Sequence, residues 1–411
     1  MDSLILQELP RIVDDGAFGK NVEFVSFEKN TDTVSQDQYM SVVSFGTVLT
    51  SDGSKYNVLI KCKTDDKVKR ERYKIDLQFH NEILMYEKIV PFLLMCRSSV
   101  ISGLSGPSIP RFFYGRNSFD ASVENDLIIL ENVNPSGFRL SEERLFLDYD
   151  HLVKALQAIA KFHGLSYIAK HKDLTGFREV IKGVIEKNKA VDEKGSWPQM
   201  LYNSLHKFGK RGIDRLLERD GVRYRGNDNL RRFEELIKDG VNSAKRAYEP
   251  REPWSVLCHG DFNRNNMLFR YDGDGGRPVD TLLFDFGTPI YGSPVLDLSF
   301  FLYMNTTQQM RESRLDDLLN VYCATLAASV PAGVRVMDRA VLDAEMAKSA
   351  LTGFASASFF LPTQLSETYS PPTDVSEKGV IDFFLNLGDT AGTEYVADMV
   401  QHMVDMSYID V

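Results

Sequence analysis

The stretch Leu257-Cys-His-Gly-Asp-Phe-Asn-Arg-Asn-Asn-Met-Leu-Phe269, together with Leu282-Leu-Phe-Asp-Phe-Gly287, decides the fold. Apolar residues of the kind found in β-strands lead into the polar end of each segment. The turn Asp272-Gly-Asp-Gly-Gly276 lies between the two segments and is a strong hairpin signal. A hairpin here would bring Asp261, Asn266 and Asp285 to one edge.

The spacing of these three residues indicates phosphoryl transfer. Asn266 follows Asp261 by five residues, as in the kinase catalytic loop H-R-D-x-x-x-x-N, and Asp285 begins an Asp-Phe-Gly. In that chemistry one carboxylate orients the acceptor hydroxyl and takes its proton, while an Asn and a second Asp hold the magnesium ion at the ATP phosphates. The alternative interpretation is two surface turns that use Asp and Gly for turn chemistry.

The composition is that of a soluble globular protein, since 43% of the 411 residues are hydrophobic and 26% are charged. The net charge of −10 argues against a nucleic-acid binder, which would carry a basic face. The sequence contains no run of about 18 apolar residues, so we expect no membrane span. Residues 1–10 do not resemble a secretory signal. The four cysteines lie far apart in the sequence and form no metal pattern. We therefore expect a reducing, cytoplasmic location.

The first third of the chain reads as a nucleotide-binding unit. Residues 22–63 are rich in strand-forming residues and end near Lys61, which we expect to reach the α and β phosphates. Residues 74–95 predict a helix that places Glu82 on its apolar face. A buried carboxylate needs a partner, and Lys61 is the natural one. The alternative is a solvated Glu82 at the edge of the stripe.

The apolar pattern stops at residues 131–138, where Pro and Gly appear. We therefore predict an N-terminal lobe over 1–131, a hinge over 132–138 and a C-terminal catalytic and substrate lobe over 139–411. Glu131 and Val133 are expected to meet the adenine edge. Ser41 is assigned to the same cofactor site, close to the phosphate turn expected at 35–39.

The rest of the chain predicts helices. We expect them over 149–171, most of 173–248, 311–328, 338–360 and 391–408, with a loop over 361–373. His163 is expected to brace the core or a loop rather than to react. Asp297 is expected either to hold the catalytic loop through its backbone or to be a charge near a helix N-terminus. The basic run over 207–225 is interpreted as a solvated face or as an attraction for an anionic ligand.

With these residues assembled, the chain resembles the ecdysteroid kinase-like (CHK kinase-like) family, which is related to aminoglycoside phosphotransferases and choline kinases. The resemblance extends from about residue 20 to 360. It rests on His-Gly-Asp-x4-Asn-Met-x-Phe, Tyr-Gly-Ser-Pro-x-Leu-Asp-Leu, Asn-Glu-Ile-x-x-Tyr-Glu-Lys-Ile-Val-Pro and Glu-Asn-Val-x3-Gly-Phe, at 259–269, 291–298, 81–91 and 131–138.

The resemblance implies an α+β, two-lobed protein-kinase-like fold with a small β-rich N-lobe and a larger, mainly helical C-lobe. It implies Asp261 as the catalytic base, Asn266 and Asp285 as magnesium ligands, and Lys61 with Glu82 as the pair that positions phosphate. The cofactors would be ATP and Mg²⁺. The partner would be a small hydroxylated molecule such as an ecdysteroid or a xenobiotic alcohol, rather than nucleic acid or a membrane.

Two positions depart from the family pattern. The turn over the phosphates, Ser35-Gln-Asp-Gln-Tyr39, contains no glycine, and Gly287 stands where the family often has Gln. Because Asp261, Asn266 and Asp285 are all present, we expect an active phosphotransferase with an alcohol acceptor. The alternatives are a choline- or aminoglycoside-type kinase and a non-catalytic pseudokinase that binds a hormone or nucleotide. A protein kinase is disfavoured because no Ala-Pro-Glu follows the Asp-Phe-Gly.

Overall fold

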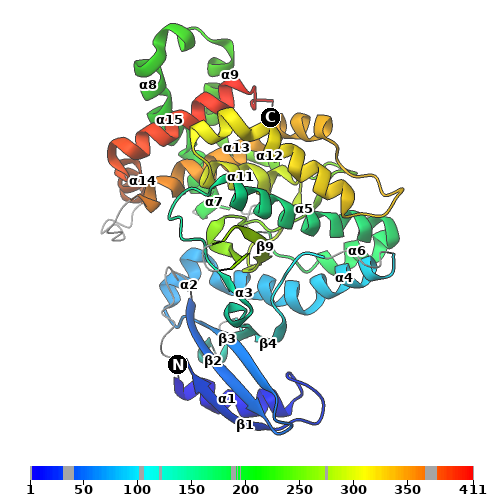
Figure 1. The fold of residues 1–411 in the computed structure, drawn as a ribbon. Coiled ribbons are helices and arrows are strands. Elements are labelled where there is room, and N and C mark those ends of the chain that lie inside the picture. Colours follow the sequence, from blue (N-terminus) through cyan, green and yellow to red (C-terminus); the bar gives the residue numbers. More distant parts are fainter. Residues whose placement is uncertain are drawn as a thin grey trace.

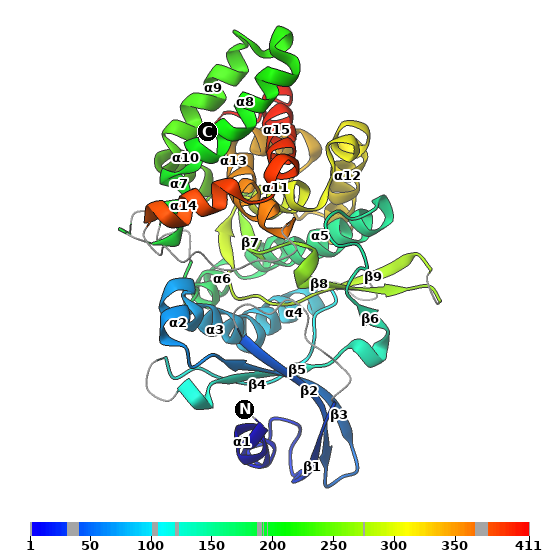
Figure 2. The same cartoon turned by 90° about the vertical axis from the view of Figure 1, so that its left-hand side faces the viewer.

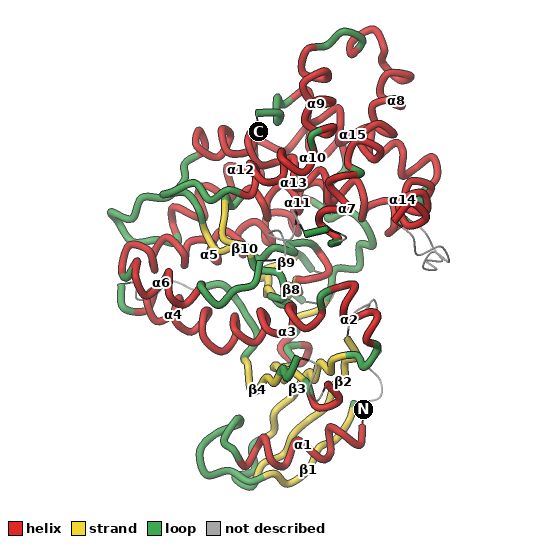
Figure 3. Tube along the Cα trace, turned by 180° about the vertical axis from the view of Figure 1, so that it is seen from behind, coloured by secondary structure: helices red, strands yellow, loops and turns green. Residues whose placement is uncertain are grey.

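The computed structural model describes residues 2–30, 41–100, 106–119, 123–186, 191, 193–194, 196–273, 276–365 and 377–410. It has a β-sheet part at the N-terminal end and a larger helical part (Figure 1). The strands of the N-terminal part gather at one end, whereas further strands lie among the helices of the larger part (Figure 3). Within the described ranges, no helix is both long and apolar enough to cross a membrane.

A five-stranded antiparallel sheet forms the N-terminal part, in the order β1-β2-β3-β5-β4. Helix α1 (Asp2–Asp14) lies against it (Figure 2), and its Leu9 and Ile12 are buried with Ile60 and Ile129 of the sheet. The strands are β1 (Phe24–Lys29), β2 (Ser41–Thr50), β3 (Lys55–Lys63), β4 (Phe112–Arg116) and β5 (Leu127–Glu131).

Side chains alternate along β3, so that Ile60 faces α1 while Lys61 and Lys63 face the opposite side of the sheet. Three helices follow β3 in the chain: α2 (Lys67–Tyr73), α3 (Ile75–Leu84) and α4 (Val90–Ser98). A π-helical turn over Met85–Ile89 joins α3 to α4. The helix predicted over 74–95 is therefore confirmed. The main hydrophobic core runs from Ile75 to Ile409 and so crosses the predicted lobe boundary at residue 131.

The C-terminal part is built mainly of helices. The first group comprises α5 (Tyr149–Lys172), α6 (Leu174–Ile181), α7 (Trp197–Asn203), α8 (Leu205–Tyr224), α9 (Asp228–Lys238) and α10 (Gly240–Tyr248). The second comprises α11 (Val295–Asn305), α12 (Gln308–Ala328), α13 (Arg339–Gln364), α14 (Glu377–Asn386) and α15 (Asp389–Asp405). These positions confirm the predicted α+β architecture.

One expectation for this part needs correction, and one helix was missed. The loop predicted from residue 361 begins later, because α13 continues to Gln364 with Pro362 inside it. Leu361 and Pro362 are buried, and this packing offsets the backbone hydrogen bond that a proline removes from a helix. Helix α14 was not predicted. Residues 366–376 lie outside the described ranges.

Between the helices lie two small sheets. In one, β6 (Phe138–Arg139), β8 (Met267–Tyr271) and β9 (Pro278–Leu283) are antiparallel neighbours. In the other, β7 (Val256–Cys258) pairs with β10 (Ile290–Gly292). The hairpin predicted between the two polar segments is thus confirmed as β8–β9.

Candidate active site

An ammonium and two carboxylates meet where the sheet faces the helical part. Lys61 Nζ on β3 lies 2.7 Å from Glu82 Oε2 on α3 and 2.9 Å from Asp285 Oδ1. The side chains of Lys61 and Glu82 are 15% and 2% exposed, whereas that of Asp285 is 39% exposed. The structure therefore brings together the predicted lysine–glutamate pair and the aspartate of the Asp-Phe-Gly.

The electrostatics of this group follow from burial and from the shared charge. Burial raises the pKa of Glu82 to about 7, although Lys61 acts in the opposite direction and Asp285 adds to the rise. Burial also acts to raise the pKa of Asp285, but the Lys61 ammonium outweighs it and the pKa is lowered. Burial would lower the pKa of Lys61, yet the two carboxylates raise it overall, so the lysine stays charged.

The β8–β9 hairpin places Asp285 beside the loop over 259–266, which contains Asp261 and Asn266. Met267 pairs with Leu283, and the Phe284 N–H donates to the Asn266 carbonyl oxygen at 3.2 Å. Asp285 itself has a φ of +63°, a left-handed conformation that a non-glycine residue adopts at a cost. The strand ends thus bring Asn266 and Asp285 to one edge, as the sequence predicts.

Two asparagines hold the carboxylate of Asp261. Asn263 Nδ2 donates to Asp261 Oδ1 and Asn266 Nδ2 donates to Asp261 Oδ2, both at 2.8 Å. Asn266 Nδ2 also donates to the Asp261 carbonyl at 2.9 Å, so the amide oxygen of Asn266 points away from Asp261.

Asp297 fixes the backbone just before Asp261. Its carboxylate accepts from the N–H groups of His259 and Gly260 at 2.7 and 2.8 Å, and from His163 Nε2 at 3.0 Å. The side chain is 1% exposed, so this ion makes its contacts away from water. The prediction that Asp297 holds the loop over 259–266 through its backbone is confirmed, and His163 braces Asp297.

Gly260 meets a strict steric requirement in this loop. Its φ is +82°, and a Cβ placed there would lie 1.6 Å from the Thr288 carbonyl oxygen. His259 Nε2 donates to the Phe284 carbonyl at 2.9 Å and joins the same two segments. The loop and the Asp-Phe-Gly segment are therefore packed backbone to backbone.

The remaining predicted cofactor residues lie in two places. Glu131 ends β5, and its side chain accepts from the Arg111 N–H at 3.2 Å. Val133 is buried against Leu282, close to Phe284. Ser41 begins β2 opposite Lys63 rather than Lys61, so the structure does not bring it to the Lys61 group. The phosphate turn at 35–39 lies outside the described residues.

Two residues of the site were not predicted. Asn263 holds Asp261, and its position two residues further along the same polar loop was the available signal. Asn81 donates from Nδ2 to the Gly287 carbonyl at 3.1 Å and so ties α3 to the Asp-Phe-Gly. Nothing local marks Asn81 for that role except its place next to Glu82.

The basic run on α8 has partners in α15. Arg215 lies 2.5 Å from Glu394, and Arg219 lies 2.7 Å from Asp398. These pairs join two helices of the C-terminal part. The run therefore serves at least in part to hold α15 against α8.

The comparison with protein-family models names the family. The family model described as the ecdysteroid kinase-like family matches residues 35–332, which is more than half of the chain. The chain therefore belongs to the ecdysteroid kinase-like family, as the sequence motifs predicted. The comparison with curated proteins found no matching sequence.

Solved structures that resemble the chain include two macrolide phosphotransferases. A macrolide 2′-phosphotransferase from Brachybacterium faecium is 14% identical, with a TM-score of 0.40, and the match covers 94% of this chain and 98% of that one. A type I macrolide 2′-phosphotransferase is 12% identical, with a TM-score of 0.34, and the match covers 94% and 97%. The family assignment rests on the sequence match rather than on these likenesses.

Proposed function

We propose that this protein is an ATP- and Mg²⁺-dependent kinase that phosphorylates a hydroxyl group of a small molecule, with an ecdysteroid or a related lipophilic or xenobiotic compound as the acceptor. The observation that supports this most strongly is Lys61, held between Glu82 and Asp285 by contacts of 2.7 and 2.9 Å. Three distant segments contribute one residue each, which is the arrangement that phosphate positioning needs.

Lys61 would bind the α and β phosphates. Its ammonium is oriented by Glu82, which is almost fully buried and cannot turn away to solvent. Positioning of this kind lowers the entropic barrier to transfer, because the lysine need not be ordered again at each turnover. Glu131 and Val133 would meet the adenine edge. Ser41 would belong to the same cofactor site, although it lies opposite Lys63 rather than Lys61.

Asp261 would orient the acceptor hydroxyl and accept its proton at a carboxylate oxygen. Asn263 and Asn266 fix both oxygens, so the carboxylate presents one defined face to the acceptor. A fixed, correctly placed base typically contributes about 10²–10⁴-fold to a rate.

The donor set near Asp261 suits magnesium. Asn266 offers an amide oxygen that points away from Asp261, and Asp285 offers the carboxylate oxygen that Lys61 does not bind. Hard divalent cations prefer such oxygen ligands. When bound, ATP and magnesium supply the transferable phosphoryl group and the neutralisation of its charge. The chain's own residues supply the orientation and the base.

The test is a panel of acceptors incubated with Mg-ATP and read by mass spectrometry for the gain of one phosphate. The panel holds ecdysteroids, plant glycosides, choline and an aminoglycoside, with Asp261→Asn as the control. A phosphorylated ecdysteroid that is absent from the control supports the full proposal. Phosphorylation of a different compound would support the kinase activity and change the proposed acceptor. Absence of both product and ATP binding would contradict the proposal and favour a non-catalytic binding protein. The cytoplasmic location stays a prediction.

A further inference from the structure

A second lysine on β3 is buried in a separate polar cluster. Lys63 Nζ lies 2.7 Å from Asp76 Oδ1 and 2.7 Å from Asp126 Oδ2, and it also donates to Asn117 Oδ1. The side chains of Lys63 and Asp126 are 0% exposed. Three oxygen acceptors satisfy the three N–H groups of an ammonium, so this charge is fully paired inside the protein.

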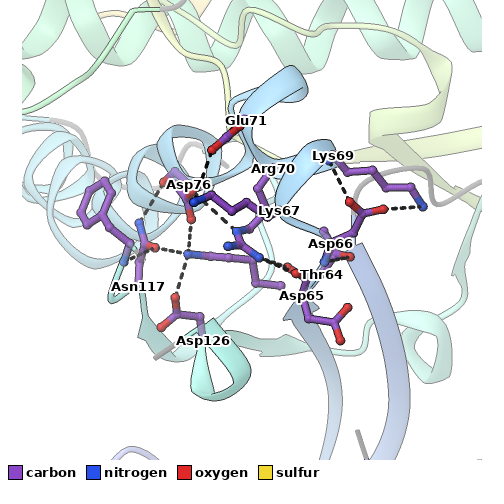
Figure 4. Close-up of polar contacts among 12 residues, drawn as sticks. Thr64, Asp65, Asp66, Lys67, Lys69, Arg70, Glu71, Asp76, Asn117 and Asp126 are labelled. Carbon is purple, nitrogen blue, oxygen red and sulfur yellow. Dashed lines mark hydrogen bonds and ion pairs between the residues drawn. The ribbon is translucent and has the colours of Figure 1, made fainter. Parts of the chain in front are cut away.

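The acceptors come from three different elements (Figure 4). Asp76 lies in the first turn of α3, Asn117 directly follows β4, and Asp126 directly precedes β5. Asn117 Nδ2 also donates to the Asp76 carbonyl at 2.9 Å. Ser118 donates to Asp126 from both its N–H and its hydroxyl. The cluster therefore joins the start of α3 to the centre and edge of the sheet.

The start of α3 depends on this cluster because its own sequence does little to fix it. Its N-cap residue, Lys74, has a left-handed backbone and no side-chain cap hydrogen bond. Arg70 of α2 adds a contact at 3.9 Å from Asp76 Oδ2, so α2 is tied to the same carboxylate. Removing one partner from a buried ion cluster leaves a buried charge without compensation, which strongly destabilises the folded arrangement around it.

One face of α3 links this cluster to the candidate active site. Asp76, Phe79 and Glu82 follow one another at three-residue spacing, which makes them neighbours on the helix surface. The Phe79 ring centroid lies 5.3 Å from Lys63 Nζ and 5.9 Å from Lys61 Nζ. This face of α3 therefore connects the Lys63 cluster to the Lys61–Glu82 pair.

We propose that the Lys63–Asp76–Asp126 cluster positions α3, so that Glu82 is held against Lys61. Lys63 and Asp76 act as positioning residues, since neither contacts the proposed phosphate site. The catalytic consequence rests on the proposed kinase function, whereas the structural consequence does not. The two are tested separately.

The structural test is hydrogen–deuterium exchange of peptides that cover residues 75–89. Asp76→Asn keeps the size of the side chain and removes the charge that pairs with Lys63. The matched control is Asp52→Asn, which makes the same change of charge and weakens the hydrogen bonds that Asp52 accepts from Thr50 and Ser54 in the β2–β3 turn at the other end of the strand. We expect exchange over 75–89 to rise at least about tenfold in Asp76→Asn and to stay unchanged in the control.

Asn117→Ala is measured in parallel, because it breaks the same cluster without changing charge and keeps the test decisive if Asp76→Asn folds poorly. Unchanged exchange over 75–89 in the folded cluster variants would overturn the proposal. So would an equal rise in Asp52→Asn, since that would show general loosening of the sheet.

The catalytic test is a double-mutant cycle of Asp76→Asn with Glu82→Gln, scored by kcat/KM for ATP. We expect Asp76→Asn to lower kcat/KM about tenfold in the wild-type background and less than about twofold when Glu82 is already Gln. A merely structural effect would give the same loss in both backgrounds and would overturn the positioning role. If the wild type neither binds ATP nor phosphorylates an acceptor, the kinase proposal fails while the exchange result still decides the structural one.

Discussion

Lys61 Nζ lies 2.9 Å from Asp285 Oδ1, although 224 residues separate the two in the chain. The contact joins the central strand of the N-terminal sheet to the segment that directly follows the β8–β9 hairpin. It also leaves one ammonium shared between two carboxylates, because Glu82 binds the same nitrogen. This sharing makes the site sensitive to charge and to pH.

Replacement of Lys61 should abolish most activity while the fold survives. In Lys61→Met, Glu82 can take up a proton, since its pKa is already raised to about 7, so no buried charge is left without compensation. We expect kcat/KM for ATP to fall by about 10²–10³, the usual loss when one electrostatic contact to the reacting group is removed. Lys55→Met, at the exposed start of the same strand, is the control and should keep its activity. A Lys61→Met enzyme as active as this control would exclude the assigned role.

The pH dependence should follow the ionisation of Glu82. The pair with Lys61 requires the carboxylate, so kcat/KM for ATP should rise as pH increases through about 7, and Glu82→Gln should lack that limb. Stability has the opposite sign. Because the folded pKa lies above the usual value of about 4.3, the folded protein binds the extra proton, and the contribution of Glu82 is lost as pH rises from about 4.3 to 7.

A pH–rate profile and urea denaturation at several pH values measure the two effects of Glu82. A wild-type profile that matches Glu82→Gln across this window would count against the assignment.

Asp297→Asn should loosen the loop over 259–266. The His259 and Gly260 N–H groups reach different oxygens of the carboxylate, and in Asn one of these oxygens becomes an NH₂ group that cannot accept. We expect a loss of about 1–3 kcal/mol in the free energy of unfolding, the cost of leaving a buried donor unsatisfied, together with a lower kcat. Asp280→Asn, on β9 and partly exposed, is the matched control and should change both quantities little. Equal effects of the two variants would show that Asp297 has no special role.

Gly260→Ala and Gly273→Ala separate backbone strain from steric contact. Both glycines have a positive φ, +82° and +71°, so alanine strains both. Only at Gly260 would the new Cβ meet another atom, the Thr288 carbonyl oxygen at 1.6 Å. We expect Gly273→Ala to cost about 1 kcal/mol and Gly260→Ala to lose most activity and a larger part of its stability. Thermal unfolding and kcat measure the difference, and similar values for both variants would refute the proposed close packing.

Much of the site could be predicted from the sequence because its signals are local. Asp261 and Asn266 are five residues apart, and a turn rich in Gly and Asp marks the hairpin that brings Asp285 to them. The Lys61–Glu82 pair followed from a general rule, since a carboxylate on an apolar helix face needs a cation. These inferences required only periodicity, turn chemistry and charge.

The rest depends on contacts between distant segments, which no local pattern reveals. Lys63 contacts Asp126, which directly precedes the neighbouring strand, and Asn81 donates to the Gly287 carbonyl in the Asp-Phe-Gly segment. The end of α13 was predicted too early because proline usually stops a helix, whereas burial of Pro362 stabilises it here. Ser41 was assigned by its nearness to the phosphate turn, but strand pairing places it opposite Lys63.

The most direct test of the central claim is the rate of phosphate transfer from Mg-ATP to a responsive acceptor in the wild type and in Asp261→Asn, with ATP affinity measured on the same samples. The account predicts a rate at least about 10²-fold lower in Asp261→Asn, with ATP affinity nearly unchanged, because Lys61 and Glu82 remain in place. Turnover like that of the wild type in Asp261→Asn would contradict the account.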